Sequence, residues 1–307
     1  MKIWFGTKTN RVDVTAIAQS LSKSGALFIP TEDRLRTQLF RQDPLFGVLK
    51  SVFVTDIEAH EIVLPSIQAA YIDWDNNKLY RVGLDEIPFS VRAPFAAEQK
   101  LATIQKQLNL SHGTFEHEYP EQMMSVMFLK GHETVLEIGG NIGRNSLVIA
   151  SILHDPERLL TLECDAGNFA MLKQNRDQNA YQFRMECAAL SKRPLFQKGW
   201  DTSITPIDGW TAIPTMDYVT LLQRNPLQFD TLVLDCEGAF YYILRDMPEV
   251  LTGIRLVIME NDYNSIEEYT FVANALIAHG LKCSYSAQLG GTWNPCHANF
   301  YEVWTSQ

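Results

Sequence analysis

The stretch TVLEIGGNIGRNSLVIASIL, residues 134–153, decides the fold predicted for this chain. It begins with a short apolar strand and ends in a helix whose apolar residues recur at helical spacing. The turn between them contains Gly139, Gly140, Asn141 and Gly143. A turn this tight needs residues that tolerate positive φ and let a ligand approach the backbone. The pattern therefore predicts a strand, a ligand-binding turn and a helix.

The residues of this turn separate two classes of ligand. The dinucleotide fingerprint G-x-G-x-x-G, started at Gly139, needs a glycine at position 141 and a small residue at 144. The chain has Asn141 and Arg144 there, so the fingerprint fails. Glu137, at the predicted strand tip, would repel a pyrophosphate and attract a cation. The turn argues against a dehydrogenase and favours a cationic ligand.

A second acid follows at an informative distance. Residues 159–163, LLTLE, read as the next strand and end in Glu163, 24 residues after Gly139 (163 − 139). An acid at this place in a parallel sheet can accept hydrogen bonds from both ribose hydroxyls of an adenosine cofactor. Asp165 is the alternative for this role.

The pattern acid-x-Gly-Gly-Asn-x-Gly of residues 137–143 resembles the first motif of S-adenosylmethionine-dependent methyltransferases, most closely that of the FkbM family. Residues 235–240, Asp-Cys-Glu-Gly-Ala-Phe, resemble the Asp-x-Glu-Gly-x-Glu signature of the same family, with Phe240 where a final Glu is usual. The resemblance covers about residues 114–304. It implies a doubly wound, Rossmann-like class I methyltransferase fold with a mostly parallel sheet, and S-adenosylmethionine as cofactor.

The resemblance and the spacing together give a set of cofactor-binding residues. They are Glu137, Gly139, Gly140, Asn141, Gly143, Glu163, Cys187, Ala188 and Asp235. Cys187 and Ala188, near the end of the third predicted strand (residues 183–190), are implied to face the adenine. Tyr119 and Glu121 are implied to lie near the methionine end of the cofactor. The other interpretation of that segment is a polar helix start with Pro120 in its first turn.

The reaction implied by the resemblance is attack of a substrate oxygen on the sulfonium methyl group. Asp235 or Glu237 can act as the general base that removes the hydroxyl proton. In a second mechanism Asp235, Glu260 and Asn261 hold Mg²⁺, which lowers the pKa of the bound hydroxyl. That pattern resembles metal-dependent catechol and sugar O-methyltransferases. The same acids could instead hold one another and the turn by hydrogen bonds.

The predicted function is therefore O-methylation, with a sugar or glycan hydroxyl as acceptor because of the habits of the resembled family. A small-molecule or lipid O- or N-acceptor is the alternative within enzymes. A catalytically inactive methyltransferase-like binding protein is the alternative outside them. The polar, proline-bearing residues 200–214 are predicted to form an irregular loop that contributes to the substrate pocket.

Composition restricts the partners and the compartment. A net charge of −10 argues against nucleic acid as a partner, because phosphate binding needs clustered Lys and Arg. The sequence contains no run of 18 apolar residues, so no membrane span is predicted. The start lacks the apolar core of a signal peptide. The five widely spaced cysteines suit free thiols. These features predict a cytoplasmic protein.

Two domains are expected. Residues 1–94 form a β-rich accessory domain in which only residues 13–23 look helical, and residues 95–307 form the methyltransferase domain. The boundary rests on Ala93-Pro94, which interrupts the pattern before a predicted helix at 95–108. Substrate recognition, a homodimer surface and a plain structural cap are three roles open to the first domain.

Overall fold

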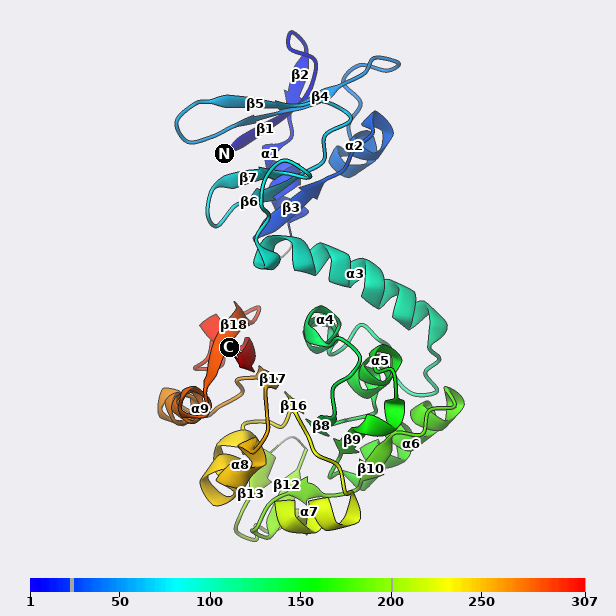
Figure 1. The fold of residues 1–307 in the computed structure, drawn as a ribbon, viewed down its shortest axis with the longest axis vertical. Coiled ribbons are helices and arrows are strands. Elements are labelled where there is room, and N and C mark those ends of the chain that lie inside the picture. Colours follow the sequence, from blue (N-terminus) through cyan, green and yellow to red (C-terminus); the bar gives the residue numbers. More distant parts are fainter. Residues whose placement is uncertain (23–24, 200, 307) are drawn as a thin grey trace. The chain divides into compact units, whose positions relative to one another are not determined.

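The computed structural model describes residues 1–22, 25–199 and 201–306 and divides into two compact units, Met1–Ala96 and Ala97–Gln307 (Figure 1). Lys23, within the predicted helix 13–23, and Trp200, within the predicted loop 200–214, lie outside the described residues.

The first unit contains two antiparallel sheets. One has the order β2-β1-β4-β5, with β1 (Lys2–Gly6), β2 (Arg11–Asp13), β4 (Ser51–Thr55) and β5 (Glu61–Leu64). The other has the order β3-β6-β7, with β3 (Ala26–Ile29), β6 (Ala70–Asp73) and β7 (Lys78–Arg81). The β-rich prediction is confirmed. A homodimer through this unit stays a prediction.

Two helices accompany these sheets, α1 (Thr15–Ser20) and α2 (Asp33–Phe40). The prediction that only residues 13–23 are helical is wrong, because α2 is a second helix. Its apolar spacing is hidden in the sequence, since Arg36 takes the buried position one turn before Phe40.

The first unit buries two cationic side chains, and both have hydrogen-bond partners in the protein. The guanidinium of Arg36, a residue with no exposed surface, donates to the carbonyl oxygens of Pro30, Leu64 and Gln68 at 2.8, 2.9 and 2.6 Å. Lys50, 1% exposed, pairs through Nζ with the carboxylates of two aspartates and donates to two backbone carbonyls. Fully bonded buried charges of this kind hold loops in place.

The helix α3 (Phe89–Gln107) runs through Pro94, so the predicted break at this proline is wrong. Pro94 lies only five residues after the first residue of the helix. It removes one backbone hydrogen bond, to the carbonyl of Ser90, and the helix continues beyond it.

The second unit is built on a seven-stranded sheet with the order β10-β9-β8-β16-β17-β19-β18. Its strands are β8 (Val135–Ile138), β9 (Leu159–Leu162), β10 (Arg184–Glu186), β16 (Thr231–Leu234), β17 (Leu256–Glu260), β18 (Leu281–Ala287) and β19 (Tyr301–Ser306). The first five are parallel and β19 is antiparallel to both its neighbours. This confirms the predicted doubly wound, mostly parallel fold.

Helices cover both faces of this sheet. They are α4 (Tyr119–Phe128), α5 (Arg144–Ile152), α6 (Ala166–Gln178), α7 (Tyr218–Arg224), α8 (Ala239–Asp246) and α9 (Ile266–Ala278). Figure 1 shows α5 and α6 on one side and α8 and α9 on the other. Because side chains alternate along a strand, Leu136 and Ile138 pack with α8 and α9, whereas Val135 packs with α4 and α5.

The region after the third parallel strand departs from prediction. The predicted strand 183–190 is split into β10 and β11 (Ala189–Leu190), and β11 leaves the main sheet to pair with β15 (Thr215–Met216). The predicted irregular loop contains β13 (Asp201–Ser203) and β14 (Thr211–Ile213), which pair with β12 (Leu195–Lys198) in a separate three-stranded antiparallel sheet. The chain therefore inserts a small sheet at this point.

The remaining helical turns are three short 3₁₀ segments, η1 (Pro156–Arg158), η2 (Pro248–Leu251) and η3 (His297–Asn299). The five cysteines are free thiols, as expected. Within the described part of the chain, no helix is long and apolar enough to cross a membrane.

Candidate functional site

The turn between β8 and α5 has no room for side chains at its glycines. Gly139 and Gly143 have φ of +93° and +91°. A Cβ on Gly139 would lie 1.6 Å from the carbonyl oxygen of Asp235, and one on Gly140 or Gly143 would lie within 2.4 Å of a neighbouring side chain. Asn141 is also left-handed, at +47°. These glycines therefore set the close approach of the turn to the end of β16.

Glu163, just beyond the end of β9, is held in place by two backbone donors. The N–H of Asn141 donates to its Oε2 at 2.8 Å and the N–H of Asp165 donates to its Oε1 at 2.7 Å. Burial raises the pKa of the Glu163 carboxyl to about 7, although these hydrogen bonds lower it. Each carboxylate oxygen keeps a further lone pair that can accept a hydrogen bond from a ligand.

A cavity of about 1190 Å³ opens beside this turn at the carboxyl ends of the parallel strands. Seven of the predicted site residues line it, namely Gly139, Asn141, Glu163, Ala188, Asp235, Glu237 and Glu260. Ligands of open parallel sheets bind at this edge. Of the other predicted residues, Gly140 and Gly143 shape the turn, and Glu137, Cys187 and Asn261 are not among the lining residues that the structure describes.

Glu137 lies inside β8, where strand alternation turns its side chain under α5. It is 2% exposed, and its Oε2 accepts hydrogen bonds from the hydroxyls of Ser146 and Thr161. Burial raises the pKa of Glu137 to about 7. This placement connects strand, helix and neighbouring strand, so it supports a structural role better than the predicted contact with a ligand.

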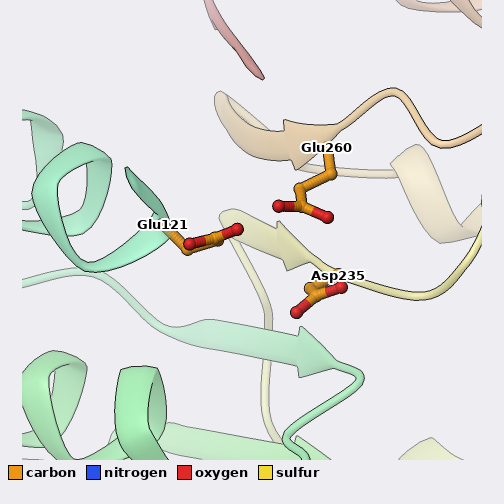
Figure 2. Close-up of side chains that lie close together, drawn as sticks. All are labelled: Glu121, Asp235 and Glu260. Carbon is orange, nitrogen blue, oxygen red and sulfur yellow. The ribbon is translucent and has the colours of Figure 1, made fainter. Parts of the chain in front are cut away.

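Three carboxylates meet at the inner end of the cavity. Oxygen atoms of Glu121, Asp235 and Glu260 lie within 4.8 Å of one another. Figure 2 shows Glu121 reaching from α4 toward the other two, which follow β16 and β17. Glu121 is 6% exposed, and its Oε2 has no hydrogen-bond partner among the described residues. Burial and the neighbouring carboxylates hold the pKa of Asp235 and of Glu260 well above the usual range.

Asn261, predicted with Asp235 and Glu260, is bonded differently. Its Nδ2 donates to the carbonyl oxygen of Asn299 at 2.6 Å, and its backbone N–H donates to that of Phe300. Its buried Oδ1 has no partner in the described part of the chain. The structure therefore brings Glu121 to the two acids, a grouping that spacing along the chain does not signal, because it depends on the packing of α4 against β17.

Glu237 stands at the outer rim in a left-handed conformation, with φ of +50°. Burial, a hydrogen bond with the Asp262 carboxyl and the charges of Asp262 and Asp201 raise the pKa of Glu237 to about 8. A non-glycine residue in this backbone region is strained, and such strain is common at functional sites. With a pKa of about 8, Glu237 is mostly protonated at pH 7, and its ionised form, the base, gains population as the pH rises toward 8.

The segment before α4 is hydrogen-bonded to the turn between β8 and α5 and to the first residue of α5. Arg144 donates from Nη1 to Glu118 Oε1 at 2.6 Å and from Nε to the carbonyl oxygen of Thr114 at 2.9 Å. Asn141 Nδ2 donates to the same Glu118 oxygen at 2.9 Å. Arg144 is thus neutralised by Glu118, and the carboxylates deeper in the cavity receive no ion pair from it.

The small sheet forms another wall of the cavity. Its lining residues are Leu195, Gln197, Thr202 and Ile213. Thr202 and Ile213 belong to the segment 200–214 that was predicted to contribute to the substrate pocket, whereas Leu195 and Gln197 precede that segment and were not predicted.

Comparisons with known proteins find only distant structural similarity. No protein-family model matches this chain, and no curated protein matches it. Similar solved structures include the ribosomal protein L11 methylase of Lactobacillus delbrueckii subsp. bulgaricus, at 10% identity over 65% of this chain and 84% of that chain, with a TM-score of 0.41. The O-methyltransferase of Bacillus cereus, in complex with SAH, shows 13% identity, 74% and 94% coverage and a TM-score of 0.39.

An O-methyltransferase of tomaymycin synthesis from Streptomyces achromogenes, in complex with SAM, is similar at 12% identity, 69% and 89% coverage and a TM-score of 0.39. At these identities and TM-scores, ligand and reaction have to be argued from the residues of this chain. Membership of the FkbM family stays a prediction.

Proposed function

We propose that this protein is an S-adenosylmethionine-dependent methyltransferase that methylates a hydroxyl group of a sugar or glycan. The observation that carries the proposal is one cavity with two acidic ends. Glu163, fixed by two backbone N–H groups, lies at one end, and Glu121, Asp235 and Glu260 lie at the other.

The Glu163 end fits a ribose. A carboxylate whose oxygens are held by backbone donors presents its remaining lone pairs in a fixed direction, and two adjacent hydroxyls can donate to them. The glycine turn beside it lets a ligand approach the backbone. An adenosine moiety therefore suits this part of the cavity.

The other end suits a ligand with positive charge. In the described part of the chain, the carboxyl groups of Glu121, Asp235 and Glu260 have no basic side chain as partner, and Arg144 is already paired with Glu118. Buried like charges are costly unless a cation or protons compensate them. S-adenosylmethionine carries a sulfonium and an ammonium group, so its methionine part supplies charge of the needed sign.

The residues of the rim suit proton removal from an acceptor hydroxyl. Methyl transfer forms an oxygen–carbon bond, breaks the carbon–sulfur bond and leaves the hydroxyl proton for a base. Glu237 is a better base than Asp235, because its pKa of about 8 is near the operating range, whereas Asp235 sits among other carboxylates that favour its protonated form. Alignment of the acceptor oxygen with the methyl group in the cavity supplies the rest of the rate enhancement.

A divalent cation such as Mg²⁺ fits the inner acids. Glu121, Asp235 and Glu260 would hold it through oxygen atoms, the donors that Mg²⁺ prefers. The Oε2 of Glu121, which has no hydrogen-bond partner among the described residues, suits a role as a ligand of such a cation. A bound cation would lower the pKa of an acceptor hydroxyl.

The sugar or glycan acceptor rests on the FkbM resemblance. The acidic rim disfavours a phosphate-rich acceptor such as nucleic acid, in keeping with the net charge of −10. An amine acceptor would need no strong base, so substitution of Glu237 would then have little effect on the rate.

The proposal is tested by calorimetric titration of the protein with S-adenosylhomocysteine and S-adenosylmethionine. We expect saturable binding that Glu163→Ala weakens by about 100-fold, since two charge-assisted hydrogen bonds are lost. Glu157→Ala is the matched control, because Glu157 is an exposed acid that precedes the same strand at its opposite end. Its affinity should equal that of the unsubstituted protein.

Transfer of a labelled methyl group to a panel of glycans then identifies the acceptor. Glu237→Gln should lower the transfer rate by at least about 100-fold and leave the affinity for S-adenosylhomocysteine unchanged. Absence of cofactor binding by the unsubstituted protein would refute the proposal. Binding without transfer to any acceptor would favour the inactive binding protein.

A further inference from the structure

The small sheet β12–β14 presents an amide and a hydroxyl to the cavity, because Gln197 of β12 pairs across the sheet with Thr202 of β13 and both line the cavity. Along β12, Leu195 and Gln197 line the cavity, whereas Phe196 and Lys198 are not among the lining residues. This is the two-residue period of a strand with one face toward a ligand. Ile213 of β14, the cross-strand partner of Leu195, adds to the apolar part of this surface.

The position of Gln197 along the cavity is fixed by its neighbour. Its Oε1 lies 3.8 Å from the Sγ of Cys164, which donates to it. Cys164 directly follows Glu163, the acid at the ribose end. Gln197 therefore lies next to the ribose position and on the side of the small sheet, away from Glu121, Asp235 and Glu260. Among the described residues, no acceptor is recorded for its Nε2 donors.

The rest of this slot is made by residues that follow the third parallel strand. Ala188, Ala189 and Leu190 line it, whereas Cys187, predicted to face the adenine, does not. A slot in which the Gln197 amide lies beside these apolar side chains suits a flat heterocycle, since the apolar side chains contact its faces and the amide bonds to its edge. An amide carries both a donor and an acceptor, as the edge of adenine does.

We propose that Gln197 is the residue that selects the adenine base of the cofactor, so that base recognition comes from the inserted sheet and not from Cys187 at the end of the third strand. This inference rests on the proposed function, because it assumes that an adenosine moiety occupies the cavity. It assigns a specificity role to β12, which precedes the predicted loop of residues 200–214.

Titration with two ligands tests the role of Gln197. The probes are S-adenosylhomocysteine and S-inosylhomocysteine, in which oxygen replaces the adenine amino group and the adjacent ring nitrogen carries a proton. The unsubstituted protein should prefer the adenine ligand by about tenfold or more, as expected for a correctly paired hydrogen bond. Gln197→Ala and Gln197→Leu should bind the adenine ligand about tenfold more weakly and discriminate less than about threefold.

Lys198→Ala is the matched control, because Lys198 is exposed and adjacent on the same strand. It should keep both the affinity and the discrimination. Two substitutions of different volume protect the test against a packing artefact, and thermal unfolding checks that each variant is folded. If both Gln197 variants discriminate between the ligands as the unsubstituted protein does, the inference is wrong and the proposed function stands. If the unsubstituted protein binds neither ligand, both are wrong.

Discussion

The two units of this protein treat buried charge in opposite ways. In the first, Arg36 and Lys50 are fully buried, and every nitrogen of Arg36 and the Nζ of Lys50 has protein partners. In the second, Glu121 keeps an unpartnered oxygen beside Asp235 and Glu260. A satisfied buried charge organises the chain around it. A buried charge without a partner indicates a ligand that supplies one.

The largest effect is expected from removing Arg36, the buried cation whose guanidinium nitrogens all have hydrogen-bond partners. Arg36→Ala leaves three buried carbonyl oxygens without donors, so the free energy of unfolding of the first unit should fall by about 3–5 kcal/mol. Urea denaturation measures this. Arg34→Ala, on the same helix but exposed, should change it by less than about 0.5 kcal/mol. Equal urea midpoints for the two variants would contradict the structural role of Arg36.

The second prediction concerns Glu137, a buried acid whose carboxylate accepts two side-chain hydrogen bonds. The pKa of Glu137 is about 7 in the folded protein and 4.5 otherwise, so the folded state binds more protons between these values. The contribution of Glu137 to the free energy of unfolding should therefore fall by about 3 kcal/mol as pH rises from about 4.5 to 7, and then level off.

Denaturation at a series of pH values checks this, with Glu137→Gln expected to fall less steeply over the same window. Glu163, also with a pKa of about 7, contributes to that window and leaves a residual slope in the variant. A variant that follows the unsubstituted protein at every pH would show that Glu137 does not titrate there.

The smallest effect is expected from substitution of Glu121, the buried acid with an oxygen that has no hydrogen-bond partner among the described residues. Glu121→Gln removes a carboxylate that is buried beside Asp235 and Glu260 with no basic partner among the described residues, so the ligand-free protein should become more stable by about 1–2 kcal/mol at pH 8. Mn²⁺, followed by electron paramagnetic resonance, should bind to the unsubstituted protein and more weakly to the variant. Glu116→Gln, an exposed acid ahead of the same helix, is the control. Loss of stability in Glu121→Gln would mean that the carboxylate has a partner in the folded protein.

The strands and the acids that end them could be predicted from sequence, because parallel strands are continuous apolar runs with polar residues where they end. Glu163 and Asp235 were located in this way and both line the cavity. Glu137 was also identified, but a one-residue step along β8 turns it into the core, and that step depends on strand register. The grouping of Glu121 with Asp235, and the small sheet carrying Gln197, depend on contacts between distant segments and leave no local pattern.

The contact between Gly139 and the carbonyl oxygen of Asp235 has a consequence for proton exchange with solvent. Because a Cβ at Gly139 would lie only 1.6 Å from that oxygen, the turn and the end of β16 are held together without intervening side chains. The Asp235 carboxyl lines the same cavity and has a raised pKa, so a cationic ligand bound there would favour its ionised form, and this linkage is reciprocal. Uptake of such a ligand should release protons, so the apparent binding enthalpy in calorimetry should vary with the ionisation enthalpy of the buffer.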